Sequence, residues 1–107
     1  MQISISSRNG SLSSEMNTYV RDKLSKLSKI FDRIASIAAT VEFHTDQTKV
    51  EVLVNAEHKH DLVASDSAAS FHGAVDLAVH KMEGQLRRYK EKIQEHRRTP
   101  PMSGTAL

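Results

Sequence analysis

Apolar residues recur at steps of three and four in two segments of this 107-residue chain. Side chains at that spacing share one face of an α-helix, so each segment predicts an amphipathic helix. The first set is Met16, Val20, Leu24, Leu27, Phe31 and Ile34, and the second is Phe71, Val75, Ala78, Met82, Leu86, Tyr89 and Ile93. We expect Ser13 to cap the first helix, and we expect the second to run from about Ser67 to Arg97.

Elsewhere the period changes from helical to two, which is typical of half-buried β-strands. Apolar and polar residues alternate around Ile3 and Ile5, over residues 39–44 and over residues 50–55, and a fourth short strand is expected at residues 62–65. The polar stretch TDQT at residues 45–48 suits a hairpin turn. The predicted order of elements is therefore β-α-β-β-β-α.

This order predicts an α+β fold, a four-stranded sheet with both helices on one face, as in double-stranded-RNA-binding domains. The first helix connects two strands, and such crossovers are parallel and right-handed in nearly all cases. The length suits a single domain, which we assign to residues 1–98. Residues 99–107 begin with TPP and are expected to form a flexible tail, because proline cannot continue a helix.

The composition narrows the class of protein. The chain has no cysteine, which excludes disulfides, thiolate zinc sites and cysteine nucleophiles. It has no apolar run of about 20 residues and no apolar signal segment at its start, so we expect a cytoplasmic protein without a membrane partner.

Charge is distributed unevenly, although the net charge is only +2. Residues 21–33 contain five basic and two acidic residues, and residues 81–98 contain seven basic and three acidic ones. Residues 34–66, which include most of the predicted strands, contain two basic and six acidic residues. The two basic segments coincide with the two predicted helices, so a fold that places these helices side by side makes the molecule a charge dipole.

The helical period aligns several of these charges in rows. One flank of the first helix carries Lys23, Lys26, Lys29 and Arg33, and one flank of the second carries Lys81, Gln85, Arg88 and Lys92. Rows of this length favour a polyanion over a small phosphate ligand. Arg87 and Lys90 point away from the second row, and both solvation and anion binding remain open for them.

Three stretches carry a resemblance to a known family: DKLSKLSKIFDRI at residues 22–34, HDLVAS at residues 60–65 and AVDLAVHKMEGQLRRYKEK at residues 74–92. Together they resemble the short form of the ribosome hibernation promoting factor family, also called ribosome-associated inhibitor A or sigma modulation protein. The similarity covers residues 1 to about 97. It implies a β-α-β-β-β-α domain that binds the small ribosomal subunit where messenger and transfer RNA otherwise sit, and that inhibits translation when growth slows.

The resemblance also implies a set of binding residues and partners. Family members use basic residues of both helices against ribosomal RNA, which matches Lys23, Lys26, Lys29, Arg33, Lys81, Arg87, Arg88, Lys90 and Lys92. We expect no cofactor, no metal, no catalysed reaction and a monomer away from the ribosome. We also expect a short family member, without the second domain through which long members dimerise ribosomes.

Other functions are weakly supported by the residues. His58 and His60 form an H-x-H pair without further ligands at a diagnostic spacing, and His72 and His80 are interpreted as surface residues of the second helix. The chain has no G-x-S-x-G elbow and no glycine-rich phosphate loop. Two alternatives remain open: a general double-stranded RNA module, and a protein-binding regulator that uses the acidic region at residues 42–66.

Overall fold

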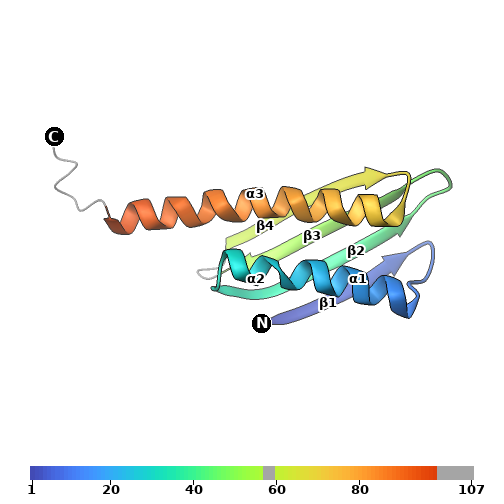
Figure 1. Ribbon diagram of the computed structural model, residues 1–107, viewed down its shortest axis with the longest axis horizontal. Helices are drawn as coiled ribbons and strands as arrows, with labels where there is room; N and C mark the ends of the chain where they lie inside the picture. The colour runs from blue at the N-terminus through green and yellow to red at the C-terminus, as the bar shows by residue number, and fades with distance from the viewer. Residues whose placement is uncertain (57–59, 99–107) are drawn as a thin grey trace.

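Four strands form one mixed sheet in the order β1-β2-β3-β4 (Figure 1). The computed structural model describes residues 1–56 and 60–98. The strands are β1 (Gln2–Arg8), β2 (Ile34–Phe43), β3 (Thr48–Ala56) and β4 (His60–Ala68). β1 pairs with β2 in parallel and the other pairings are antiparallel, which confirms the parallel crossover. The predicted hairpin turn lies between β2 and β3, where the His44 amide donates to the Gln47 carbonyl at 2.9 Å.

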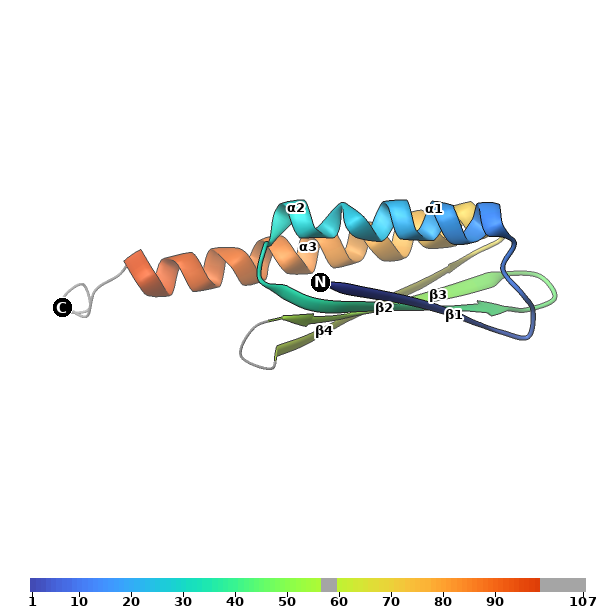
Figure 2. The same ribbon diagram turned by 90° about the horizontal axis from the view of Figure 1, so that it is seen from below.

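The helices form a second layer on one face of this sheet (Figure 2). They are α1 (Ser14–Ser25), α2 (Leu27–Ile30) and α3 (Phe71–Arg98). The predicted cap is confirmed, because the Ser13 hydroxyl accepts from the Met16 amide at 3.1 Å. The predicted α+β architecture is therefore confirmed: a four-stranded sheet with its helices on one side.

The first helical segment is shorter than the apolar period predicted. α1 ends at Ser25, a tight turn at Lys26 leads into α2, and the backbone at Phe31 is extended. The hydroxyls of Ser25 and Ser28 each donate to the carbonyl three residues earlier, and such local bonds compete with regular helix. Ile34 continues the helical spacing but lies in β2, so its assignment to the helix was wrong.

The boundary between β4 and α3 also differs from the prediction. β4 continues to Ala68, which pairs with Thr48 of β3, so the strand is longer than the predicted residues 62–65. α3 begins at Phe71 and not near Ser67, because Ser70 caps it: the Ser70 hydroxyl accepts from the Gly73 amide at 3.0 Å.

The core lies between the two layers. Its fully buried side chains include Leu24 and Leu27 from the first helices, Ile37 from the sheet, and Met82 and Leu86 from α3. α3 packs mainly on β4 and β3, whereas α1 contacts β1 and α3. No helix within the described ranges is long and apolar enough to cross a membrane. The helix layer therefore presents one flank of α3 towards α1 and α2, and the other towards β4.

Candidate nucleic-acid interface

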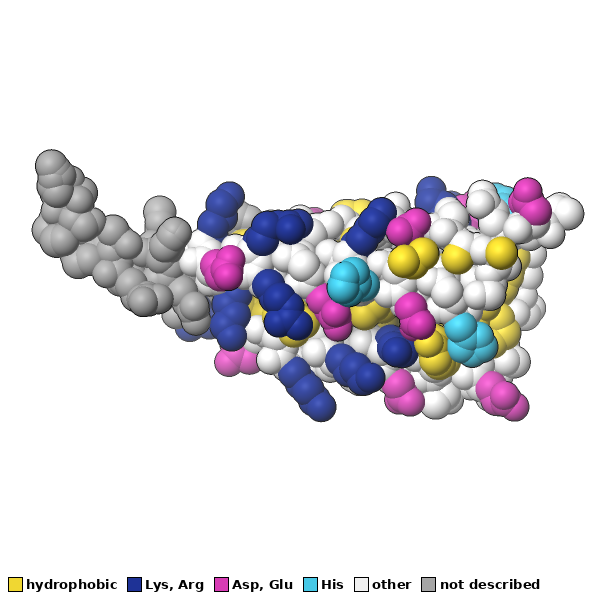
Figure 3. All heavy atoms as spheres, turned by 45° about the horizontal axis from the view of Figure 1, so that its top comes forward, with side chains coloured by type: hydrophobic (Ala, Val, Ile, Leu, Met, Phe, Trp, Pro, Cys, Tyr) yellow, Lys and Arg dark blue, Asp and Glu magenta, His cyan; other side chains and the backbone are white. Residues whose placement is uncertain are grey.

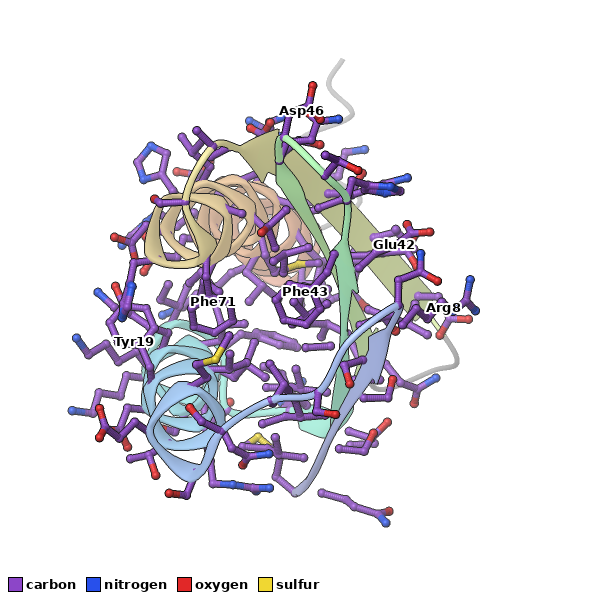
Figure 4. The ribbon with its side chains drawn as sticks, turned by 90° about the vertical axis from the view of Figure 1, so that its right-hand side faces the viewer. Arg8, Tyr19, Glu42, Phe43, Asp46 and Phe71 are labelled. Atoms are coloured by element: carbon purple, nitrogen blue, oxygen red, sulfur yellow. The ribbon has the colours of Figure 1, made fainter. Side chains whose placement is uncertain are left out.

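A polar contact joins α1 to α3 where the two helices face each other. The Tyr19 hydroxyl donates to Asp76 Oδ1 at 2.6 Å, and Lys23 Nζ lies 3.5 Å from the same oxygen. The hydrogen bond to Asp76 and partial burial raise the pKa of Tyr19 above its ordinary value. The Tyr19 ring also contacts His72 edge-on and lies 6.2 Å from the Phe71 ring, at the end of the molecule shown in Figure 4.

This contact lies on the flank of α3 that faces the first helices. Asp76 belongs to that flank, and Arg87 and Lys90 follow on the same flank at helical spacing. Arg87 and Lys90 line a hollow together with Lys29 and Ile30 of α2. Arg87 and Lys90 therefore point away from the row of Lys81, Gln85, Arg88 and Lys92, as predicted, and they lie beside α2.

The opposite flank of α3 is turned towards the edge strand β4. Lys81 Nζ donates to the Ser65 carbonyl at 3.2 Å and lies 3.3 Å from Asp66 Oδ2, and Gln85 Nε2 donates to the Val63 carbonyl at 2.7 Å. Hydrogen bonds from the Ser67 amide, which has the larger effect, and from Lys81 lower the pKa of the Asp66 carboxyl group. These bonds cap free carbonyls of an edge strand, which limits unwanted strand pairing. The predicted row of Lys81, Gln85, Arg88 and Lys92 thus lies on the flank remote from α1.

The nine basic residues singled out from the sequence fall into three groups. Lys23 and Lys81 are held in ion pairs within the protein. Arg33 is half-buried after α2, outside the helix that was expected to carry it, and lines a hollow with Lys29 and Lys90. The others are exposed and form no ion pair with a residue that the structure describes: Lys26, Lys29, Arg87, Arg88, Lys90 and Lys92.

Lysine and arginine side chains gather on the half of the helix layer towards the C-terminal end of α3 (Figure 3). Exposed hydrophobic and histidine side chains are more frequent towards the other end of the same face. His72 and His80 are exposed on α3, as predicted, and His80 Nδ1 lies 3.8 Å from Glu83 Oε1. We call this part of the helix layer the cationic area, and such a concentration of positive charge suits a polyanion. It comprises Lys26, Lys29, Arg33, Arg87, Arg88, Lys90 and Lys92.

No group of three potential metal ligands occurs among residues 1–56 and 60–98. Of the H-x-H pair, His58 and the side chain of His60 lie outside the described part of the chain. The structure therefore offers no metal centre in the part that it describes.

The uncovered face of the sheet carries both signs of charge. Arg8 and Glu42 project from it on the side away from the helices (Figure 4), and Lys49 and Glu51 line a small depression with them. Leu53 and Val63, neighbours across β3 and β4, are exposed on the same face. On this face Glu42 and Glu51 thus lie beside the cations Arg8 and Lys49, whereas Glu57, which was counted with the acidic residues, lies outside the described part of the chain.

Fold and surface together define a small two-layer α+β domain with a cationic area on its helix layer. A sequence model of the family described as sigma 54 modulation protein / S30EA ribosomal protein matches residues 3–94, and the chain belongs to this family. This match confirms the resemblance found in the sequence. Neither the family description nor the names of the relatives below specify a catalysed reaction.

Two relatives and one solved structure illustrate the relationship. A ribosome hibernation promoting factor of Klebsiella oxytoca is 32% identical over 98 residues, covering 90% of this chain and 100% of the relative. One of Azotobacter vinelandii is 29% identical over 92 residues, covering 86% and 85%. The structure of a ribosomal subunit interface protein from Coxiella burnetii superposes with a TM-score of 0.79 at 23% identity, covering 85% of this chain and 99% of that one.

Proposed function

We propose that this protein is a ribosome hibernation factor that binds the small ribosomal subunit and inhibits translation in stationary phase or stress. The observation that carries the proposal is the full-length relationship to hibernation promoting factors, since the Klebsiella oxytoca relative aligns over 100% of its own length. In this proposal the protein occupies the messenger channel in the decoding region and excludes messenger and transfer RNA. It acts by occupancy and requires neither a cofactor nor a catalysed reaction.

The cationic area supplies the chemistry that ribosomal RNA requires. Phosphate contacts from lysine and arginine provide most of the sequence-independent affinity for nucleic acid. The proposed contacts are Lys26, Lys29, Arg33, Arg87, Arg88, Lys90 and Lys92. Lys23 and Lys81 contribute mainly through the scaffold, because Lys23 helps to join α1 to α3 and Lys81 joins α3 to β4.

Cosedimentation of the protein with purified ribosomal subunits tests the proposal. We expect the protein to sediment with small subunits, and we expect an excess of free duplex RNA to displace it poorly. Efficient displacement would instead indicate a general double-stranded RNA module, because such modules recognise the shape of any duplex. Binding that survives neutralisation of the cationic area would indicate a regulator that binds protein through another face.

Competition with transfer RNA tests the position on the subunit. A protein that occupies the decoding region should prevent stable binding of transfer RNA to messenger-programmed small subunits. Simultaneous stable occupancy by both ligands would place the protein elsewhere on the ribosome and refute the proposed mode of inhibition.

A further inference from the structure

The cationic area contains a hollow between α2 and the C-terminal part of α3 that is partly apolar. One part has a volume of about 340 Å³ and is lined by Lys29, Ile30, Phe31, Asp32, Arg33, Lys90 and Ile93. An adjoining part of about 500 Å³ is lined by Lys29, Ile30, Arg87, Lys90 and Glu91. Each volume falls within the range of about 300–1,000 Å³ that is usual for small-molecule sites.

The apolar wall of the hollow is held in place by aromatic packing. Phe31 is only 6% exposed, and its ring meets that of Tyr89 edge-on at a centroid distance of 5.3 Å. Ile30 and Ile93 are half-buried beside it, so each leaves apolar surface accessible to a ligand. This wall joins α2 to α3.

Charge around the hollow favours an anion. Four cations line its two parts, Lys29, Arg33, Arg87 and Lys90, against two carboxylates, Asp32 and Glu91. Phosphates on the outside of a duplex would satisfy Lys29, Arg87 and Lys90 but would leave the accessible apolar surface of Ile30 and Ile93 uncovered. A ligand that satisfies both combines an apolar group with neighbouring negative charges, as a nucleotide does.

We propose that this hollow binds one unstacked nucleotide of RNA, with its base against Ile30 and Ile93 and the flanking phosphates near Lys29, Arg87 and Lys90. Proteins that recognise RNA typically do so at loops and bulges, whose bases are free to leave the stack. The inference rests on the proposed function, because it requires RNA as the ligand. It adds that the protein distinguishes a strand with an extruded base from a regular duplex.

The test compares three RNA hairpins by fluorescence anisotropy: one with a single-nucleotide bulge, one with an abasic residue at that bulge, and one fully paired. The first two have the same number of phosphates and differ only in the base. We expect the base to increase affinity about tenfold, or about 1.4 kcal/mol, which is near the lower end of the range for bases stacked on aromatic side chains because the wall here is aliphatic. Equal affinity for the base-bearing and abasic bulges, or no binding of the bulged hairpin, would overturn the inference.

Two variants separate the apolar wall from the charges. Ile93→Gln should abolish the preference for the base-bearing bulge and leave affinity for the paired hairpin unchanged. Leu53→Gln is the matched control, since Leu53 is 39% exposed on the uncovered face of the sheet, and it should keep the preference. Thermal melts establish that both variants are folded. An Ile93→Gln variant that is folded and retains the full preference would overturn the assignment of the base to this hollow.

The same measurements distinguish the failure of this inference from the failure of the proposed function. Equal affinities for the hairpins together with salt-sensitive binding to small subunits would overturn the nucleotide site alone. If the protein binds neither small subunits nor any of the three hairpins, the proposed function is overturned and the nucleotide site with it.

Discussion

Neutralising the cations that face each other across α2 and α3 should reduce the salt dependence of binding to small subunits. The variant is Lys29→Gln, Arg87→Gln and Lys90→Gln, three exposed residues that line the same hollow. Glutamine is a good helix former, and an exposed charge typically contributes less than about 1 kcal/mol to stability. We therefore expect the variant to remain folded while its affinity for RNA falls.

The expected magnitude follows from the number of phosphate contacts. Each contact contributes about 0.7 to 0.9 to the slope of the logarithm of the binding constant against the logarithm of salt concentration. The six exposed cations that form no ion pair with described residues would give a slope of about −4 to −5. Raising salt from about 50 to 200 mM should then weaken binding on the order of a thousandfold for the unaltered protein. Removing three contacts should decrease the steepness of the slope by about 2 to 3.

A second triple variant controls for net charge. It combines Arg8→Gln, Lys49→Gln and Lys81→Gln and removes the same formal charge. Arg8 and Lys49 lie on the uncovered face of the sheet, and Lys81 is hydrogen-bonded to the Ser65 carbonyl of β4. We expect this variant to keep the slope of the unaltered protein in a cosedimentation series at several salt concentrations. Equal loss of slope in both variants would refute the reasoning, because binding would then depend on total charge and not on where the cations lie.

Three further predictions concern the scaffold. Leu86→Ala removes a fully buried side chain and should lower the free energy of unfolding by about 2 to 5 kcal/mol, measured by denaturant titration; a loss far below this would contradict tight packing of α3 on the sheet. Asp76→Asn should lower the pKa of Tyr19 towards its ordinary value of 10.0, measured by ultraviolet titration. A raised pKa stabilises the folded protein below the ordinary pKa, and this stability is lost as pH rises through the folded pKa. The variant should therefore be less stable than the unaltered protein below pH 10.0 and should not differ by this effect at higher pH. Lys81→Gln should raise the pKa of Asp66 towards 3.8, observed by NMR, because it removes a hydrogen bond and a positive charge that lower this pKa. The stability due to the lowered pKa is present above the ordinary value and is lost as pH falls through the folded value, so the variant should lose stability above the ordinary value. An unchanged pKa would exclude the ion pair.

The architecture could be predicted from the sequence because burial of one face imposes a period on each element. Most of the apolar positions in β2, β3 and the stripe on α3 are buried in the structure, with Val50, Val52, Met82 and Leu86 almost completely buried. The errors occurred at ends of elements. Ile34 and Ser67 fitted a helical spacing, but spacing alone does not register the turn after α2 or the continued pairing of β4 with β3.

The binding surface was predictable only as a set of charges. Helical geometry places Lys81 and Gln85 on one flank of α3 and Arg87 and Lys90 on the other, and the sequence alone determines that separation. The tertiary structure decides which flank faces α2. The apolar stripe of α3 must be buried against β3 and β4, and the direction in which it packs fixes the positions of both flanks. The hollow beside Ile30 and Ile93 likewise exists only once α2 and α3 are packed together, since its walls are more than fifty residues apart in the chain and no local period relates them.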